Sequence, residues 1–284
     1  MLRSLAVIKR VLGDALGHFN NDDGWAIASH LALSALLAMF PFLIFATSLA
    51  SFLGAQAFAD TAVHLVFDTW PDEIAGPIAG EVMSVLTVQR GDVLTVGILA
   101  AAFFASNGVE ALRVGLNRAY RVIDRRSIFW LRAQSLAFVL IATLGIVIVS
   151  SLLVVVPIAV GIAQQHLPWI HPYLGTITVW RYVIAALVIV LALIAVHMWL
   201  PAGRRRLRDI IPGLIFTLVF WILGSTIFAA YLSRFSSYVT TYAGLASIMI
   251  ALVFLYIVSA IFILGGELNA AIRRYLDARA KVRG

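Results

Sequence analysis

Five polar residues at helical spacing are the side chains of this 284-residue chain best placed to do chemistry. On an α-helix, with roughly 100° between successive residues, they fall within about 120° of arc. They form one polar stripe on an otherwise apolar segment: Asn107, Glu110, Arg113, Asn117 and Arg121. Ionisable groups inside an apolar helix are costly to bury, so they face protein or water and have partners.

Two interpretations of this stripe are open. In the first, it lines a water-accessible cavity and binds or relays a charged species. In the second, Glu110 and Arg113 pair at i, i+3 and hold the helix to its neighbours. Glu267 presents the same choice, because an arginine from 121–132 or 204–208 could meet its carboxylate. The sequence favours a structural ion pair in both cases.

Familiar catalytic patterns are missing. The chain has no Walker A loop, H-E-x-x-H, G-x-S-x-G or dinucleotide fingerprint. Its six histidines are scattered, with no pair at metal-ligand spacing on one helix face, and it has no cysteine. We therefore expect the chain not to be an enzyme and to hold neither a metal nor a cofactor.

A proline and an arginine block add two further expectations. Pro41 falls in the middle of an apolar segment, where it removes a backbone hydrogen bond and is expected to kink a helix. The block could bind anionic lipid headgroups, or it could simply keep its loop on the inner side of a membrane, which the sequence favours. It consists of Arg204, Arg205, Arg206 and Arg208.

The elements that must position these residues are membrane helices. Hydrophobic residues make up 62% of the chain and charged residues 12%, with a mean hydropathy of +0.98. Soluble domains run at about 45–50% apolar and about 25% charged. A span needs roughly 20 apolar residues, and six stretches meet that length: 25–53, 93–112, 135–162, 177–200, 210–232 and 245–268. The predicted fold is an all-α bundle of six transmembrane helices.

The placement of the basic residues predicts the topology. Most of the 21 lysines and arginines lie in alternate connections, at 1–24, 113–134, 201–209 and 269–284. This is the positive-inside pattern, and it predicts that both termini are cytoplasmic. It also accounts for the net charge of +7 without a nucleic-acid partner.

Three regions follow from this topology. Residues 1–24 have apolar positions at a helical period, which predicts an amphipathic helix on the membrane surface or packed against the bundle. Residues 25–268 form the six-span domain, with short amphipathic helices predicted in the first outer connection, 54–92. Residues 269–284 form a basic cytoplasmic tail.

Several short motifs follow one another along the chain: 29–41, 115–121, Leu200-Pro201 followed by arginines, Pro212-Gly213, Phe228-x-x-Tyr231, Tyr242-Ala-Gly244 and 264–269. Together they resemble the YihY/BrkB family of bacterial inner-membrane proteins, once labelled as ribonuclease BN. There are two small departures, since Ala243 separates a Tyr-Gly pair that is adjacent in the family and Gly266 replaces an alanine.

The resemblance implies a six-helix fold and a multi-pass inner-membrane location, and transport of lipids or ions has been proposed for relatives. Our first hypothesis is a transporter or flippase-like protein that moves an ion or an anionic amphiphile through a cytoplasm-facing cavity, past Asn107, Glu110 and Glu267. The alternative is a non-catalytic assembly or envelope-integrity partner. A membrane-embedded enzyme, including a ribonuclease, is the least favoured. Expected partners are anionic headgroups of the inner leaflet, with a second copy or another membrane protein left open.

Overall fold

A computed structural model describes residues 2–52, 91–234 and 243–283, and within these ranges the chain is helical with no strand. The predicted helices of the first outer connection, 54–92, lie almost entirely outside the described residues. The α-helices are α1 (Leu2–Asn21), α2 (Gly24–Phe52), α5 (Gly91–Ala119), α6 (Ile128–Ser150), α7 (Val156–His166), α8 (Leu174–Trp199), α9 (Leu207–Arg234) and α11 (Ala243–Arg283).

Helices lie on all six predicted apolar segments, although several begin or end elsewhere than predicted and the segment 135–162 is divided among α6, a π-helical turn and α7. α5 continues to Ala119 and therefore carries Asn117 as well as Glu110. α6 begins at Ile128, capped by the Ser127 side chain, which accepts from the Trp130 backbone N–H at 3.4 Å. α11 runs on to Arg283, so the basic segment predicted as a tail is helical up to that residue.

Four helical stretches of the described chain are long and apolar enough to cross a membrane: 128–164, 169–199, 207–232 and 248–281. α2 and α5 contain 29 residues each, which corresponds to about 44 Å of helix. The six-span count and the inward position of both termini remain predictions.

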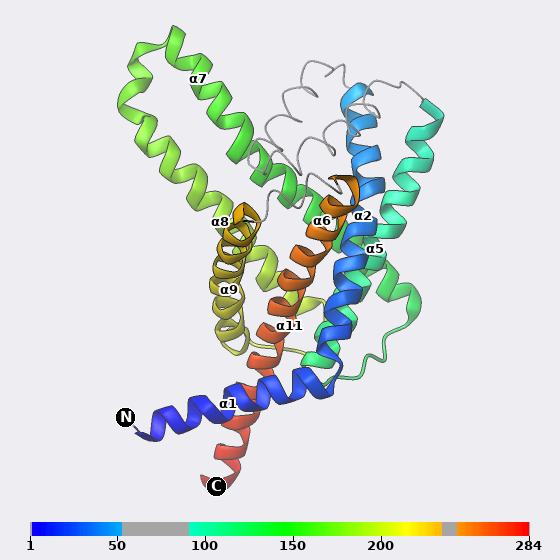
Figure 1. The fold of residues 1–284 in the computed structure, drawn as a ribbon, viewed down its shortest axis with the longest axis vertical. Coiled ribbons are helices and arrows are strands. Elements are labelled where there is room, and N and C mark those ends of the chain that lie inside the picture. Colours follow the sequence, from blue (N-terminus) through cyan, green and yellow to red (C-terminus); the bar gives the residue numbers. More distant parts are fainter. Residues whose placement is uncertain (1, 53–90, 235–242, 284) are drawn as a thin grey trace.

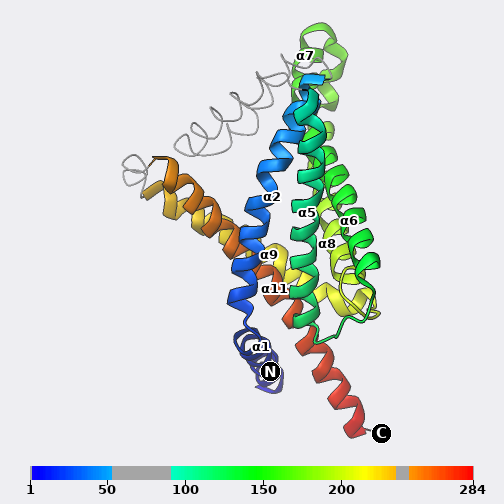
Figure 2. The same ribbon diagram turned by 90° about the vertical axis from the view of Figure 1, so that its right-hand side faces the viewer.

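The long helices form a bundle with α1 across one end (Figure 1). α2, α5 and α11 pack together, and α9 lies along α11. Their core is made of buried apolar side chains such as Leu31, Leu116 and Ile263. Both ends of the chain lie at the end covered by α1, as the turned view in Figure 2 also shows. We call this the basic end, because the loops 120–127 and 200–206 and the end of α11 bring arginines to it.

α6, α7 and α8 form a long hairpin that extends away from the rest of the bundle (Figure 1). Between α6 and α7 the helix widens into a π-helical turn, Ser151–Val155, and Pro157 is the second residue of α7. A proline has no N–H to donate to the preceding turn, and a π-turn is one way for a helix to accommodate it. A short 3₁₀ helix, Pro168–Tyr173, leads into α8.

The kink predicted at Pro41 concerns the middle of α2. The backbone is assigned as one α-helix from Gly24 to Phe52, across the proline. The side chain of Pro41 lies outside the described residues, so the kink stays a prediction.

α1 has two apolar faces. Val11 and Ala15 are buried against α11, and Phe19 is buried edge-on against Trp25, with ring centroids 4.8 Å apart. The other face carries Ile8 and Leu12 in exposed positions, followed by Leu16 one turn later. α1 is thus packed on the bundle and still presents an apolar strip outward.

We predict that this strip lies in the lipid interface. A Leu12→Trp variant is reconstituted into vesicles with brominated lipids, which quench the fluorescence of a tryptophan that they contact. We expect more quenching in this variant than in wild type, as the sign of a lipid contact at position 12. An exposed position on the opposite side of the same helix, in Arg10→Trp, serves as the matched control and should add less quenching. Equal quenching at both positions would contradict the interfacial placement.

Candidate functional site

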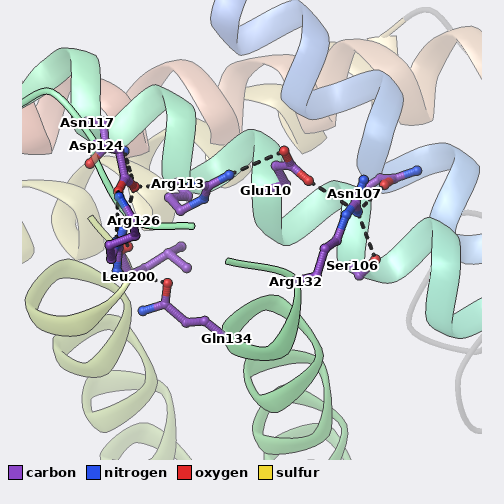
Figure 3. A network of polar contacts seen from close by, with 10 residues as sticks. All are labelled: Ser106, Asn107, Glu110, Arg113, Asn117, Asp124, Arg126, Arg132, Gln134 and Leu200. Atoms are coloured by element: carbon purple, nitrogen blue, oxygen red, sulfur yellow. Dashed lines mark hydrogen bonds and ion pairs between the residues drawn. The ribbon is translucent and has the colours of Figure 1, made fainter. Parts of the chain in front are cut away.

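The polar stripe on α5 is part of a chain of ion pairs and hydrogen bonds (Figure 3). Glu110 lies 3.2 Å from the Arg113 guanidinium and 3.1 Å from that of Arg132 on α6. Arg132 also donates to the Asn107 side-chain oxygen at 2.7 Å. The i, i+3 pair predicted from the sequence is therefore present, and α6 supplies a second cation to it.

Asp124, in the loop after α5, is the centre of the second half of this network. It accepts hydrogen bonds from Arg113 at 3.1 Å and Asn117 at 3.1 Å. Arg126 binds it through two nitrogens, at 2.8 and 2.6 Å. These hydrogen bonds, above all those from Arg126, hold the pKa of Asp124 well below its usual range.

Arg126 and Asn117 tie this loop to the end of α8. The Arg126 guanidinium also donates to the Leu200 carbonyl at 2.9 Å and to the Gln134 side chain at 3.0 Å. The Asn117 side-chain oxygen accepts from the Ala202 backbone N–H at 2.7 Å. We call the set formed by Asn107, Glu110, Arg113, Asn117, Asp124, Arg126 and Arg132 the charge network. It joins α5, α6 and the loop after α8.

Arg121 and Glu267 form a separate pair. Arg121 adopts a left-handed backbone conformation, with φ of 56°. Its guanidinium Nη2 lies 3.8 Å from Glu267 Oε2 on α11. Glu267 is 1% exposed, and its Oε2 has no hydrogen-bond partner among the described residues. Of the two arginine groups considered from the sequence, the loop 121–132 thus supplies the partner.

A polar cluster lies next to this pair, around the Tyr120 hydroxyl. The hydroxyl is 2.9 Å from His197 Nδ1 and accepts from the Asn269 side chain at 3.2 Å. Asn269 in turn accepts from the Gly213 N–H at 2.6 Å. The Arg205 guanidinium lies over the Tyr120 ring, 3.9 Å from its centroid. Burial raises the pKa of Tyr120 to about 12, so this hydroxyl keeps its proton.

A cavity of about 400 Å³ opens at the basic end, and we call it the basic pocket. Tyr120 and Asn269 belong to its lining, together with five arginines and two aspartates. The charged lining residues are Arg121, Arg204, Arg205, Arg273, Arg274, Asp209 and Asp277. A second hollow of about 500 Å³ shares Arg204 and Arg205 with it and is bordered by Trp199, which is largely exposed.

Two arginines of the basic pocket have guanidinium donors without a hydrogen-bond acceptor in the described part of the chain. Arg121 Nε and Nη2 and Arg205 Nη1 are buried and have no hydrogen-bond partner among the described residues. Burial lowers the pKa of Arg205, and the neighbouring Arg273 and Arg126 add to this effect. Buried donors of this kind are costly unless something accepts from them. The pocket is therefore suited to an anion.

The structure divides the predicted site residues into three groups. Asn107, Glu110, Arg113 and Asn117 belong to the charge network and line neither of the two cavities. Arg121, Arg204 and Arg205 line the basic pocket, with Glu267 directly behind Arg121. Arg206 and Arg208 are exposed and line neither cavity. In the described part of the chain, no group of three or more histidines and carboxylates is gathered as metal ligands.

Three of the residues that matter here carry little signal in the sequence. In the sequence, Tyr120 and His197 are ordinary residues near the ends of predicted helices. Asp124 is one acidic residue in a basic loop. His197 offers the one usable hint, because a histidine in an apolar segment needs a hydrogen-bond partner when it is buried. It is 0% exposed, and Tyr120 is that partner.

The helices define the class of this chain, an α-helical membrane protein with several apolar helices of spanning length. The chain belongs to the Virulence factor BrkB family, whose family model matches residues 15–284. The resemblance seen in the sequence motifs is thereby confirmed.

Several named bacterial proteins are similar over most of their length. The ribonuclease-like protein YfkH of Bacillus subtilis (strain 168) is 29% identical over 264 residues, covering 93% of this chain and 95% of the relative. A UPF0761 membrane protein of Alteromonas mediterranea is 24% identical, with 86% and 81% covered. A UPF0761 membrane protein of Coxiella burnetii (strain RSA 331) is 27% identical, with 86% of both chains covered. No solved structure matches the chain.

Proposed function

We propose that this chain is a flippase-like transporter of a bacterial inner membrane, which moves an anionic amphiphile and receives its headgroup in the basic pocket. One observation carries the proposal: Arg121 and Arg205 line the cavity, and both have buried guanidinium donors without an acceptor among the described residues. An anionic headgroup would supply the missing acceptors and offset the buried charge. The proposed role is not enzymatic, and the ribonuclease-like name of one relative is not carried over.

The surroundings of the pocket favour an amphiphile over a free ion. Arg204 and Arg205 border both cavities, and the second cavity reaches Trp199 and Met198 at the end of α8. Leu207 and Ile211, at the start of α9, are also exposed. In a membrane these apolar side chains would be lipid-facing. A headgroup among the arginines could then keep its acyl chains in the bilayer.

In the proposed topology the basic end is cytoplasmic, as the positive-inside pattern predicts. The charge network then has a supporting role. It holds the loop that carries Tyr120 and Arg121 against α8 and α11, so the two pocket residues are presented from a fixed turn. Glu110 and Asn107 act on this scaffold and do not contact the transported molecule.

The test uses vesicles of phosphatidylethanolamine and phosphatidylglycerol with a trace of phosphatidylglycerol carrying a fluorophore on its acyl chain. Dithionite bleaches only the outer leaflet, so a protein that exchanges lipid between leaflets increases the bleached fraction. We expect this with the wild-type chain. Bleaching equal to that of protein-free vesicles would overturn the proposal. Uptake of radiolabelled phosphate in place of lipid exchange would point to a free anion.

Within the arginine block, we predict that two positions matter for exchange and two do not. Arg204→Gln with Arg205→Gln removes two pocket charges and should slow exchange about 25-fold, at roughly 1 kcal/mol per arginine. Arg206→Gln with Arg208→Gln removes the same charge from the same loop and should leave exchange unchanged. Arg204→Gln alone, at an exposed position, keeps the comparison valid if the first double variant is poorly folded. Equal effects of both double variants would show that only the total charge matters.

A second candidate is a non-transporting assembly partner. It is favoured by the charge network, whose carboxylates are both engaged by arginines of the same chain. Such a scaffold would leave lipid exchange at the protein-free level while a stable partner co-purifies from membranes. The vesicle experiment separates the two candidates.

A further inference from the structure

Arg121 lies between the Glu267 carboxylate and the basic pocket, and its positive charge can stabilise a negative charge in either place. On one side its Nη2 lies 3.8 Å from Oε2 of the buried Glu267. On the other side it is part of the lining of the basic pocket, which Glu267 is not. The distance to Glu267 is longer than a hydrogen bond, and both Nε and Nη2 lack a hydrogen-bond partner in the described structure. Arg121 is therefore weakly held on the carboxylate side and has donors left for an anion.

Among the described residues, Arg121 is the only cation within 4 Å of the Glu267 carboxylate. The Glu267 side chain is almost fully buried on α11, and its Oε2 accepts no hydrogen bond from the described residues. A buried carboxylate that loses its counter-ion cannot stay ionised at reasonable cost, and protonation is the usual remedy. If Arg121 turned to an anion in the pocket, Glu267 would have to gain a proton.

The other charged groups around Glu267 do not take over the role of Arg121. Asp14 of α1 and Asp22, between α1 and α2, are further carboxylates whose negative charge acts on that of Glu267. Arg274 does not replace Arg121, because it donates to Asp14 at 2.8 Å. His18 is also engaged by Asp14, at 3.2 Å.

In the part of the chain that the structure describes, no other helix packed against α11 brings a cation within 4 Å of Glu267. On α9, Asp209 is paired with Arg273 at 3.8 Å. On α5, Arg118 points to Asp23 at 3.9 Å. α2 carries no lysine, arginine, aspartate or glutamate, and its one histidine, His30, is exposed.

We propose that binding of an anion in the basic pocket is coupled to uptake of one proton by Glu267, with Arg121 shared between the two. The proton comes from the solvent and adds to the Glu267 carboxylate, while the Arg121 N–H groups turn to the oxygens of the anion. Because binding linkage is reciprocal, a lower pH must then strengthen anion binding. This inference rests on the proposed function, since it assumes that the pocket binds an anion, and it makes the transport step one in which anion and proton move together.

The experiment measures proton uptake directly, on the purified full chain in detergent. Two probes are titrated by calorimetry in buffers of different ionisation enthalpy: sulfate, whose charge is constant across neutral pH, and a short-chain phosphatidylglycerol. Over the pH range in which Glu267 is ionised before binding, wild type should take up about one proton per bound probe, and its affinity should fall by up to about tenfold per pH unit as the pH rises. Glu267→Gln should still bind, with no proton uptake and no pH dependence. Asp23→Asn, at an exposed carboxylate outside the charge network and the pocket, is the matched control and should behave like wild type.

Each result has a distinct meaning. Binding with equal proton uptake in wild type and Glu267→Gln, or with none in either, overturns the coupling and leaves the pocket as an anion site. If neither probe binds to wild type, the coupling falls together with the proposed function. Binding of sulfate would show that a free oxyanion is sufficient to occupy the pocket. Binding of the lipid but not of sulfate would show that the pocket takes a headgroup together with its acyl chains. If Glu267→Gln does not fold, infrared difference spectra of wild type test the proton uptake instead. The proposal requires a new protonated-carboxyl band when the probe is added, and the absence of this band would overturn the coupling.

Discussion

Gly213→Ala should lower the free energy of unfolding by about 3 kcal/mol or more, because α9 and α11 touch at this position. A Cβ added there would collide with the backbone oxygen of Gly265 and lie 2.5 Å from the Asn269 side-chain nitrogen. The Gly265 oxygen is backbone, so the two helices would have to separate. Small residues at such crossings let membrane helices approach closely.

The measurement is thermal unfolding of purified protein in detergent, followed by tryptophan fluorescence. Gly161→Ala on α7 is the matched control, since nothing lies within 4 Å of an added Cβ at that position. It should be neutral or slightly stabilising, because alanine has the higher helix propensity. Identical melting curves for both variants would contradict the close approach of α9 and α11. A second readout is the pocket itself, because the displaced Asn269 is also a partner of Tyr120.

The local part of the site could be predicted from the sequence. The stripe from Asn107 to Arg121 depends only on helical spacing, and the pairing of Glu110 with Arg113 spans one turn of a single helix. The existence of the long helices was predictable for the same reason, since apolar runs of spanning length are read directly from the chain. Their ends were less so, because the start of α6 depends on the Ser127 cap and the length of α11 on its packing against α1.

The tertiary part of the site could not be predicted. Arg132 and Asp124 are partners of the stripe because α6 and the loop before it fold back on α5. For Glu267 the sequence offered two groups of arginines, and only the positive-φ turn at Arg121 settles which of them reaches it. The stripe was interpreted as one surface, yet its first four residues bind each other and their neighbours while the fifth turns to the pocket. Helical spacing gives the direction of a side chain but not what stands opposite it.

Asp124→Asn should destabilise the fold by about 3–5 kcal/mol at neutral pH, which is the usual cost of breaking a buried ion pair by removing one partner. The Asp124 side chain is 12% exposed and that of Arg113 only 6%, so solvent screens the pair little. The asparagine keeps the shape, but its NH2 group is a donor where one carboxylate oxygen accepts, so the variant removes the charge together with the hydrogen bonds to that oxygen. Without it, Arg113 and Arg126 lose the carboxylate they share.

The pH dependence of the free energy of unfolding tests whether the charge of Asp124 stabilises the loop. Hydrogen bonds from Arg126 hold the pKa of Asp124 below its usual value. The stabilisation is therefore fully present above the unfolded-state pKa, about 3.9, and is lost as the pH falls through the folded-state value. The gap in stability between wild type and Asp124→Asn should shrink below about pH 4. Asp23→Asn is the control, since Asp23 is exposed, lies 3.9 Å from Arg118 and has a positive φ that asparagine tolerates. A gap that stays constant from neutral to acid pH would mean that Asp124 stabilises the loop by its shape and not by its charge.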